Sequence, residues 1–478
     1  FDGHVTSDCW AIKDFHEGHG LTQSPVESVA LAMNSGCDLN CGHIYVNLLE
    51  AVKQGLVSEE TLTRAVERLY VSKMRLGIFD APEHVPYNTI DYSVVDSKEQ
   101  KAFNLEVAKK TLCLLKNEKQ TLPLDKNKLK TVGVIGPNAN NRKALIGNYE
   151  GTASEYVTVL EGIQEYLGDD VRVLYSEGCH LFKNKVSGLG QENDRIAEVR
   201  AVCDASDVVV AVMGLDSGLE GEEGDQGNEF ASGDKPNLEL PGLQNTVLQE
   251  IYASGKPVVL VLLSGSALAF PWAEEHIPAI VQAWYPGAQG GRAVAQMLFG
   301  EYSPEGKLPV TFYRTSEELP AFTDYNMKGR TYRYMENEAL YPFGYGLGYT
   351  EFSLKEVALS AKEVAKGEEL TVTAVLENKG DFAGAETIQV YVKAKNVKNA
   401  PHYQLKGLKK VRVAANESVQ VELVLKDTAF ALYDEDAKLM LNEGEYQVFV
   451  GTSQPDARSV ALTGKKPYCF DVICKKTV

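Results

Sequence analysis

The chain has 478 residues, 44% hydrophobic and 24% charged, which is an ordinary composition for a globular protein. A chain of this length predicts two to four domains rather than one. The formal net charge is −18, from 66 acidic and 48 basic residues, and it argues against nucleic acid as a partner because it repels phosphate backbones. No window holds the roughly 18 uninterrupted apolar residues of a membrane helix, so no membrane partner is predicted.

The chain opens with a short Val/Thr segment that leads into Ser7-Asp8-Cys9. This pattern suits a carboxylate exposed at the end of a strand. In a parallel β/α barrel, catalytic groups sit at the carboxyl ends of the strands. The alternative is that Asp8 only caps the following helix.

Residues 25–33 predict a helix that begins with Pro and ends before Gly36, and residues 37–41 predict a short strand. Two more helices are expected over 46–54 and 58–76. The last helix is expected to turn these apolar side chains inward: Leu62, Ala65, Val66, Leu69, Val71 and Met74.

Residues 1–80 therefore predict the end of a (β/α)8 TIM barrel. A complete barrel is typically about 250 residues long, so roughly 200 residues with about six strands are expected outside this sequence. The first residue is Phe, and the sequence neither shows nor excludes a signal peptide. Secreted, periplasmic and cytoplasmic locations all stay open.

After a linker over 81–96, residues 97–312 alternate helices with apolar strands. That alternation predicts a mainly parallel sheet covered on both faces, an α/β sandwich domain. The expected helices are 100–116, 159–167, 194–204, 241–253 and 291–298, and the expected strands are 131–135, 171–175, 208–213, 257–263 and 279–283.

A second linker over 313–348 precedes a change of period. From 349 to 478 the apolar residues alternate with polar ones in short segments, which predicts an antiparallel β-sandwich of fibronectin type III-like kind. The expected strands include 370–375, 387–392, 418–425 and 444–450.

Eight cysteines are too few for a scaffold built on disulfides at this length. Cys37, Cys41 and His43 have the spacing of half a zinc site, but no second Cys/His pair stands near them. We therefore expect no metal ligands.

An acidic, glycine-rich stretch over 214–225 follows the strand at 208–213. Such runs are usually solvated loops. Ligands of open α/β sheets, however, bind at the carboxyl ends of the parallel strands, and this stretch lies at one. Crowding of like charges raises the pKa of one carboxyl among several, so this stretch can supply both an ionised carboxylate and a proton donor.

Several motifs along the chain resemble glycoside hydrolase family 3. They are Ser7-Asp8-Cys9, Gly147-Asn148-Tyr149-Glu150-Gly151, Leu240-Pro241-Gly242, Trp284-Tyr285-Pro286-Gly287, Gly306-Lys307-Leu308-Pro309 and Tyr341-Pro342-Phe343-Gly344. Each is weak alone, but together and in this order they are specific.

The resemblance implies a retaining exo-β-glycosidase that releases xylosyl or glucosyl residues from oligosaccharides, with no metal or organic cofactor. It implies Asp8 as nucleophile and Glu220 as acid/base, with Glu222 as runner-up. Asn148 and Tyr149 are placed beside the sugar, although core packing of Tyr149 is almost as good an interpretation.

The resemblance also places Cys9 and Cys41 next to the substrate. It makes them a candidate disulfide, with two reduced thiols as an equal alternative. Ser7-Asp8-Cys9 and Asn40-Cys41-Gly42 favour xylose, while β-glucosidase specificity is kept as an alternative. The expected partners are a glycoside substrate and the barrel segment of the same enzyme, and a homodimer stays open. The rival hypothesis is a non-catalytic carbohydrate-binding or interaction chain.

Overall fold

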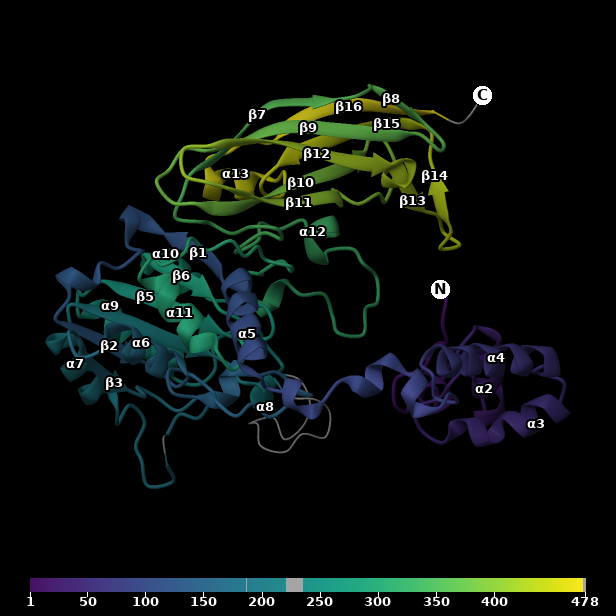
Figure 1. The fold of residues 1–478 in the computed structure, drawn as a ribbon, viewed down its shortest axis with the longest axis horizontal. Coiled ribbons are helices and arrows are strands. Elements are labelled where there is room, and N and C mark those ends of the chain that lie inside the picture. Colours follow the sequence, from purple (N-terminus) through teal and green to yellow (C-terminus); the bar gives the residue numbers. More distant parts are fainter. Residues whose placement is uncertain (186, 221–234, 476–478) are drawn as a thin grey trace. The chain divides into compact units, whose positions relative to one another are not determined.

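The chain folds into two compact units, Phe1–Val95 and Asp96–Val478, in a computed structural model (Figure 1). The structure describes residues 1–185, 187–220 and 235–475. Each unit is described by itself below.

The first unit is built from short helices around a small core. Its helices are α1 (Asp14–Glu17), α2 (Pro25–Asn34), η1 (Ile44–Asn47), α3 (Leu48–Lys53) and α4 (Glu59–Arg75). Ser24 and Ser58 cap α2 and α4, since their hydroxyls accept the backbone N–H of Glu27 and Thr61. These caps confirm the predicted helix starts. The 3-10 turns η2 (Pro82–His84), η3 (Pro86–Thr89) and η4 (Tyr92–Val94) follow.

Two expectations for this unit are wrong. The strand predicted over 37–41 is reduced to a single parallel bridge between Thr6 and Leu39. Of the α4 side chains expected inside, Ala65 is buried, but Val66, Val71 and Met74 are 46%, 44% and 61% exposed. The apolar periodicity of α4 was interpreted correctly as a helix. However, the core of the unit is too small to cover more than a narrow stripe of it.

The second unit begins with a six-stranded sheet in the order β1-β6-β5-β4-β2-β3. Strands β2 to β6 run parallel, and β1 pairs antiparallel with β6 at one edge. The strands are β1 (Cys113–Asn117), β2 (Thr131–Ile135), β3 (Arg172–Ser176), β4 (Val208–Gly214), β5 (Val258–Leu263) and β6 (Ala279–Gln282). The parallel order confirms the predicted α/β domain.

Helices cover both faces of this sheet (Figure 1). One core lies under α5 (Lys98–Thr111), α6 (Val159–Leu167) and α11 (Gly290–Leu298). The other lies under α7 (Ile196–Ala205), α9 (Gln244–Ala253) and α10 (Pro271–His276). Side chains alternate between the two cores along each strand. On β4, Val210 belongs to the first and Val209 to the second.

The helix expected over 100–116 runs too far, because α5 ends at Thr111 and Cys113 begins β1. The apolar run Cys113-Leu114-Leu115 fits a helix and a strand equally well by pattern. Pairing with β6 decides for the strand, with Cys113 opposite Gln282.

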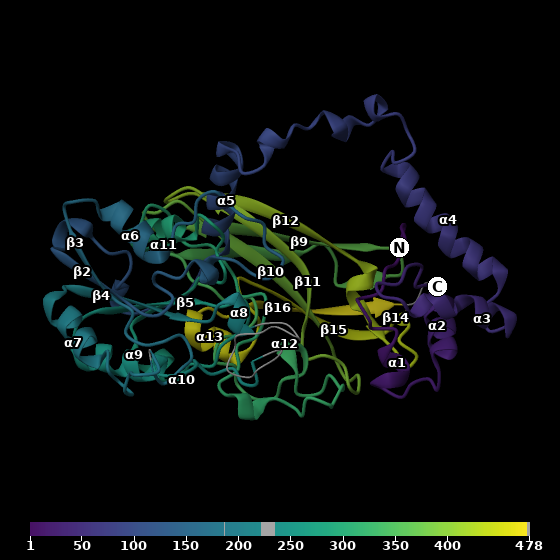
Figure 2. The same ribbon diagram turned by 90° about the horizontal axis from the view of Figure 1, so that it is seen from below.

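The last part of the second unit is a β-sandwich, as predicted. Its five-stranded sheet has the order β11-β10-β15-β16-β8 and its three-stranded sheet has the order β12-β9-β7, with β13 and β14 as a separate pair (Figures 1 and 2). The strands are β7 (Phe352–Leu359), β8 (Glu363–Ala365), β9 (Glu369–Asn378), β10 (Gly384–Ala394), β11 (Gln404–Val413), β12 (Ser418–Lys426), β13 (Ala431–Tyr433), β14 (Leu439–Leu441), β15 (Gly444–Gly451) and β16 (Tyr468–Lys475).

Short helical segments complete this unit. Helix α12 (Thr331–Tyr334) and the turn η8 (Ser316–Glu318) lie in the connection that precedes the sandwich, and α13 (Ala457–Thr463) lies between β15 and β16.

Candidate active site

The short helix α8 (Ser217–Glu220) begins three residues after the end of the buried strand β4 at Gly214. Asp216, 8% exposed, accepts the backbone N–H of Leu219 at 2.9 Å and the side-chain amide of Asn141 at 3.2 Å. Asn141 follows β2, the neighbour of β4 in the sheet. These two hydrogen bonds of Asp216 hold the turn that carries Glu220, one from within α8 and one from the segment after β2.

Three hydrogen bonds to the Glu220 carboxylate come from the described residues. The backbone N–H of Gly265 donates to Oε2 at 2.8 Å, the Tyr285 hydroxyl donates to the same oxygen, and the Ser266 hydroxyl donates to Oε1. Gly265 and Ser266 follow β5, and Tyr285 follows β6. Neighbouring parallel strands end at one edge of the sheet, which is why these groups meet.

Glycine is required at 265 because a Cβ there would lie 2.6 Å from Glu220 Oε2 and 2.9 Å from Tyr285 Cε2. Sequence reasoning missed Ser266 and Tyr285 as partners of Glu220. The sequence held a partial signal, since both follow predicted parallel strands and the carboxyl ends of such strands lie at one edge of the sheet, but it did not give the order of the strands.

The electrostatics of this pocket follow from burial and from the Glu220 charge. Burial, and then the nearby Glu220 carboxylate, raise the pKa of the Tyr285 hydroxyl, which therefore stays protonated as a donor. Burial lowers the pKa of Lys235 to about 8, against the attraction of Glu239 and Glu220. Its Nζ donates to the Glu239 carbonyl at 2.6 Å and to Asn237 Oδ1 at 2.9 Å. Glu222, the alternative acid/base, lies outside the described residues.

Asp8 lies in the first unit, on an exposed segment. Its Oδ1 accepts the backbone N–H of Cys9 at 2.8 Å. The Ser7 hydroxyl accepts the backbone N–H of Cys41 at 3.0 Å, and Ser7 N–H donates to the Leu39 carbonyl at 2.8 Å. The segment that carries Asp8 is thus paired with residues 39–41.

A disulfide joins Cys9 to Cys41 and closes this pairing one residue beyond Asp8. Of the two alternatives left open by the sequence, the structure has the bonded one. Cys37 has a free thiol. Among the described residues, no group of three or more His, Cys, Asp or Glu side chains is arranged to hold a metal ion.

Asn148 and Tyr149 lie on an exposed loop of the second unit. Tyr149 is 88% exposed and has a φ of 62°, so its interpretation as a core residue is wrong. A Cβ built on Gly147 would lie 3.9 Å from Tyr285 Cδ2. The loop therefore begins beside the Tyr285 ring, close to the Glu220 carboxylate.

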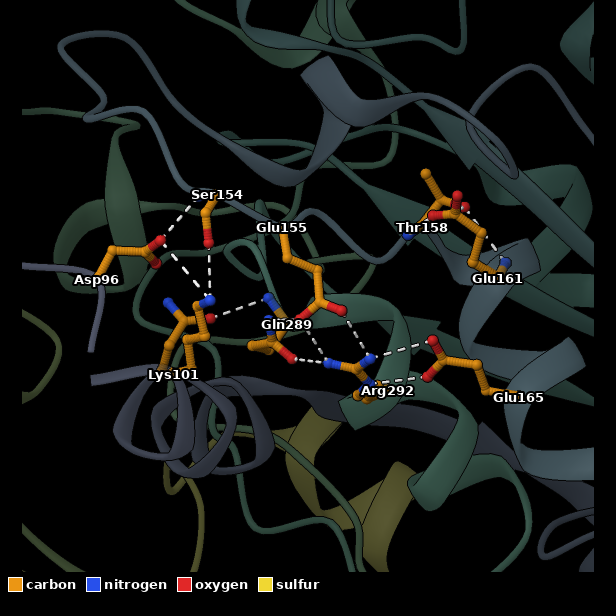
Figure 3. Close-up of polar contacts among 10 residues, drawn as sticks. Asp96, Lys101, Ser154, Glu155, Thr158, Glu161, Glu165, Gln289 and Arg292 are labelled. Atoms are coloured by element: carbon orange, nitrogen blue, oxygen red, sulfur yellow. Dashed lines mark hydrogen bonds and ion pairs between the residues drawn. The ribbon is translucent and has the colours of Figure 1, made fainter. Parts of the chain in front are cut away.

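The far end of this loop is held at Ser154 (Figure 3). The Asp96 carboxylate accepts the Ser154 backbone N–H at 2.9 Å, and Lys101 Nζ donates to the Ser154 hydroxyl at 2.7 Å. Lys101 also lies 3.7 Å from Asp96 Oδ2. These contacts tie the loop to the start of α5.

Arg292 on α11 holds the next residue of the loop (Figure 3). Its guanidinium contacts Glu155 at 3.0 Å and Glu165 on α6 at 2.7 Å. Hydrogen bonds to the two carboxylates raise the pKa of Arg292, so the charge is permanent. The loop with Asn148 and Tyr149 is therefore anchored to three helices, α5, α6 and α11.

No helix among the described residues has the length and apolar character needed to cross a membrane.

Comparison with known proteins places the chain in a family. Residues 112–349 match the glycosyl hydrolase family 3 C-terminal domain, and residues 386–454 match a fibronectin type III-like domain. The xylan 1,4-beta-xylosidase of Xylanibacter ruminicola is 30% identical over 97% of this chain and 69% of its own length. The periplasmic beta-glucosidase of Salmonella typhimurium is 31% identical over 94% of this chain and 62% of its own.

Among solved structures, a β-glucosidase from Erythrobacter marinus superposes with a TM-score of 0.82 at 30% identity. That match covers 99% of this chain and 64% of the other. The chain thus spans roughly two thirds of the length of these relatives. With the motifs, the α/β domain and the fibronectin type III-like sandwich all in agreement, the chain belongs to glycoside hydrolase family 3.

Proposed function

We propose that the enzyme carrying this sequence is a retaining exo-β-glycosidase. It removes terminal β-D-xylosyl or β-D-glucosyl residues from the non-reducing ends of oligosaccharides. The relatives carry the names β-xylosidase and β-glucosidase, and their family agrees with that of this chain.

The observation that supports this function best is the placement of Glu220. A carboxylate at the carboxyl end of a parallel sheet, half-buried and held by three donors, has the fixed position that a proton donor needs. In this proposal Glu220 protonates the leaving oxygen and later takes a proton from water.

Asp8 is the proposed nucleophile. Its carboxylate is exposed, which a group that must reach a sugar carbon requires. Residues 1–80 form the end of a (β/α)8 barrel in this proposal, and the parallel bridge between Thr6 and Leu39 supports two neighbouring barrel strands ending there. The proposed domains are 1–80, 97–312 and 349–478, with linkers at 81–96 and 313–348.

Retaining chemistry requires the two carboxyl groups to lie about 5–5.5 Å apart in the competent state. Asp8 and Glu220 belong to different units. The proposal therefore depends on this distance in the active enzyme. Asn148 and Tyr149 are proposed to contact the bound sugar from the anchored loop.

Xylose is the preferred substrate in this proposal, because Ser7-Asp8-Cys9 and Asn40-Cys41-Gly42 have the form typical of the β-xylosidase branch. A glucoside-specific enzyme is the second candidate, supported by the β-glucosidases among the relatives.

The test is hydrolysis of nitrophenyl β-xyloside and nitrophenyl β-glucoside by the full-length enzyme that carries this sequence. We expect release of nitrophenol with the xyloside favoured, and a β-configured sugar as the first product. Hydrolysis with inversion, or no hydrolysis of either glycoside, would contradict the proposal. A higher kcat/KM for the glucoside would contradict only the xylose preference.

A further inference from the structure

The three donors on Glu220 are divided unequally between its two oxygens. Among the hydrogen bonds between described residues, Oε2 accepts both the Gly265 backbone N–H and the Tyr285 hydroxyl, whereas Oε1 accepts one, from the Ser266 hydroxyl. An acid/base carboxyl must carry a proton on one oxygen and none on the other. The unequal number of donors therefore affects which of the two oxygens carries the proton that is transferred.

A proton on Oε2 would meet two donors, and one of them, the Gly265 N–H, belongs to the backbone and cannot turn away. A proton on Oε1 meets only a serine hydroxyl, which can rotate and accept instead of donating. Protonation of Oε1 requires only the Ser266 hydroxyl to turn and accept. Protonation of Oε2 requires the Tyr285 hydroxyl to turn and leaves the fixed Gly265 N–H donating to a protonated oxygen, which is a weaker acceptor than a carbonyl oxygen, so the proton is better placed on Oε1.

We propose that Oε1 of Glu220 carries the catalytic proton and that Tyr285 is the positioning residue that anchors Oε2. This inference rests on the proposed function of Glu220 as acid/base. It adds which oxygen reacts and which side chain sets its orientation.

The surroundings of Tyr285 suit an anchor. The raised pKa of its hydroxyl keeps it a donor over the whole working pH range. Among the described residues, Asp216 helps to raise the pKa of Tyr285, and Lys235 is attracted to Glu220. The ring lies close to the Gly265 backbone, because a Cβ built on Gly265 would stand 2.9 Å from Tyr285 Cε2.

The steps balance as follows. In the first, the Oε1–H bond breaks and the proton passes to the glycosidic oxygen as the C1–O bond breaks and an Asp8 oxygen bonds to C1. In the second, water gives its proton to Oε1 while its oxygen displaces Asp8 from C1. Throughout, Oε2 keeps the Tyr285 and Gly265 hydrogen bonds.

The test is Tyr285→Phe in the full-length enzyme, with two substrates that differ in the leaving group. An alkyl β-xyloside needs a proton donor, and a dinitrophenyl β-xyloside does not. Loss of a hydrogen bond to a charged group predicts a roughly 10- to 100-fold fall in kcat/KM for the alkyl glycoside. The dinitrophenyl glycoside should stay within about threefold of the wild type.

The pH profile gives a second readout that a merely structural role would not move. Tyr285→Phe removes a donor that stabilises the ionised carboxylate, so the alkaline limb of kcat/KM should move to higher pH. An unmoved alkaline limb would contradict the anchoring role.

Two further variants make the test specific. In Ser266→Ala, Oε1 loses its partner but keeps its freedom to hold a proton, so the alkyl glycoside should lose no more than about fivefold. Tyr349→Phe is the matched control, because its part-buried hydroxyl donates to the Met297 carbonyl at 2.8 Å rather than to a carboxylate. It should change stability without changing the leaving-group dependence or the pH profile.

The inference fails if Tyr285→Phe slows both glycosides equally, or if Ser266→Ala gives the stronger leaving-group dependence. Failure of the proposed function would look different. In that case Glu220→Ala itself would show no leaving-group dependence. With Glu220→Ala behaving as an acid/base variant, the outcome for Tyr285→Phe decides the inference alone.

Discussion

The two candidate carboxylates are held in opposite ways. Glu220 is partly buried and takes hydrogen bonds from groups that follow two different strands, β5 and β6. Asp8 is exposed and accepts a hydrogen bond from its own neighbour, Cys9. The α/β domain thus fixes its carboxylate with its own sheet, whereas the position of Asp8 depends on how residues 5–9 pair with residues 38–41.

The hydrophobic cores behind the two carboxylates also differ in size. The sheet behind Glu220 is buried on both faces by apolar side chains. The Asp8 segment has a small core, the Cys9–Cys41 disulfide and a few backbone hydrogen bonds behind it. The comparison implies that breaking the pairing behind Asp8 acts on local stability and on turnover, while changes in the donors to Glu220 act mainly on turnover.

The largest effect is expected from Asp8→Asn. An amide cannot form the glycosyl ester, so kcat should fall by roughly 10³-fold or more while the unfolding temperature is kept. Steady-state kinetics and calorimetry on the same preparation provide the measurement. A variant with near-wild-type turnover would remove Asp8 from the mechanism.

The next effect concerns the disulfide. Replacing Cys9 and Cys41 together by Ser opens a loop with a sequence separation of 32 residues. The chain-entropy relation predicts a loss of about 3–4 kcal/mol in the stability of the first unit. Denaturant unfolding checks this, with Cys469→Ser, at an exposed free thiol, as the control. An unchanged unfolding midpoint would show that the pairing of residues 5–9 with 38–41 does not need the bond.

Gly265→Ala tests how tightly the Glu220 carboxylate is held. The new Cβ would come 2.6 Å from Glu220 Oε2, so the carboxylate has to move off its donors. We expect a roughly 10- to 100-fold fall in kcat/KM for alkyl glycosides, the size expected when a charged group loses at least one hydrogen bond. We expect little change in the free energy of unfolding. Gly188→Ala, where a Cβ would meet nothing within 4 Å, is the matched control. Equal kinetics in the two variants would refute the tight fit at Gly265.

The smallest effect is expected from Arg292→Ala. The substitution releases Glu155 and one end of the loop with Asn148 and Tyr149. We expect KM to rise about two- to fivefold with kcat nearly unchanged, because a partly exposed ion pair contributes about 1 kcal/mol or less. Arg200→Ala removes a comparable pair, Arg200–Glu250 at 2.9 Å, away from the loop. A KM that rises equally in both variants would argue against anchoring of the loop.

The sequence predicted most of the fold because its periodicities are strong. The buried strands β4 and β5 are nearly continuous apolar runs rich in Val, and the caps Ser24 and Ser58 stand where their helices begin. The failures have a common cause. Whether Cys113–Asn117 is helix or strand, and whether α4 buries Val66, depends on partners distant in the chain rather than on local pattern.

The candidate site divides in the same way. Asp8 and Glu220 could be proposed from their motifs, because each stands beside recognisable neighbours in the chain. The partners of Glu220 could not, since Gly265, Ser266 and Tyr285 meet it only through the order of β4, β5 and β6 in the sheet. Tyr149 was ambiguous for a related reason, because an aromatic residue carries no sign of whether its surroundings cover it.

The central claim is that Glu220 is the acid/base, and the most direct test is Glu220→Ala in the full-length enzyme with and without azide. We predict that hydrolysis of dinitrophenyl β-xyloside is largely spared in its first step while alkyl β-xylosides are hardly cleaved. Azide should then accelerate turnover and yield the β-glycosyl azide, because it attacks the glycosyl-enzyme without needing a general base. Equal loss with both substrates and no azide product would contradict the account. The same pattern in Glu222→Ala instead would move the acid/base two residues along the chain.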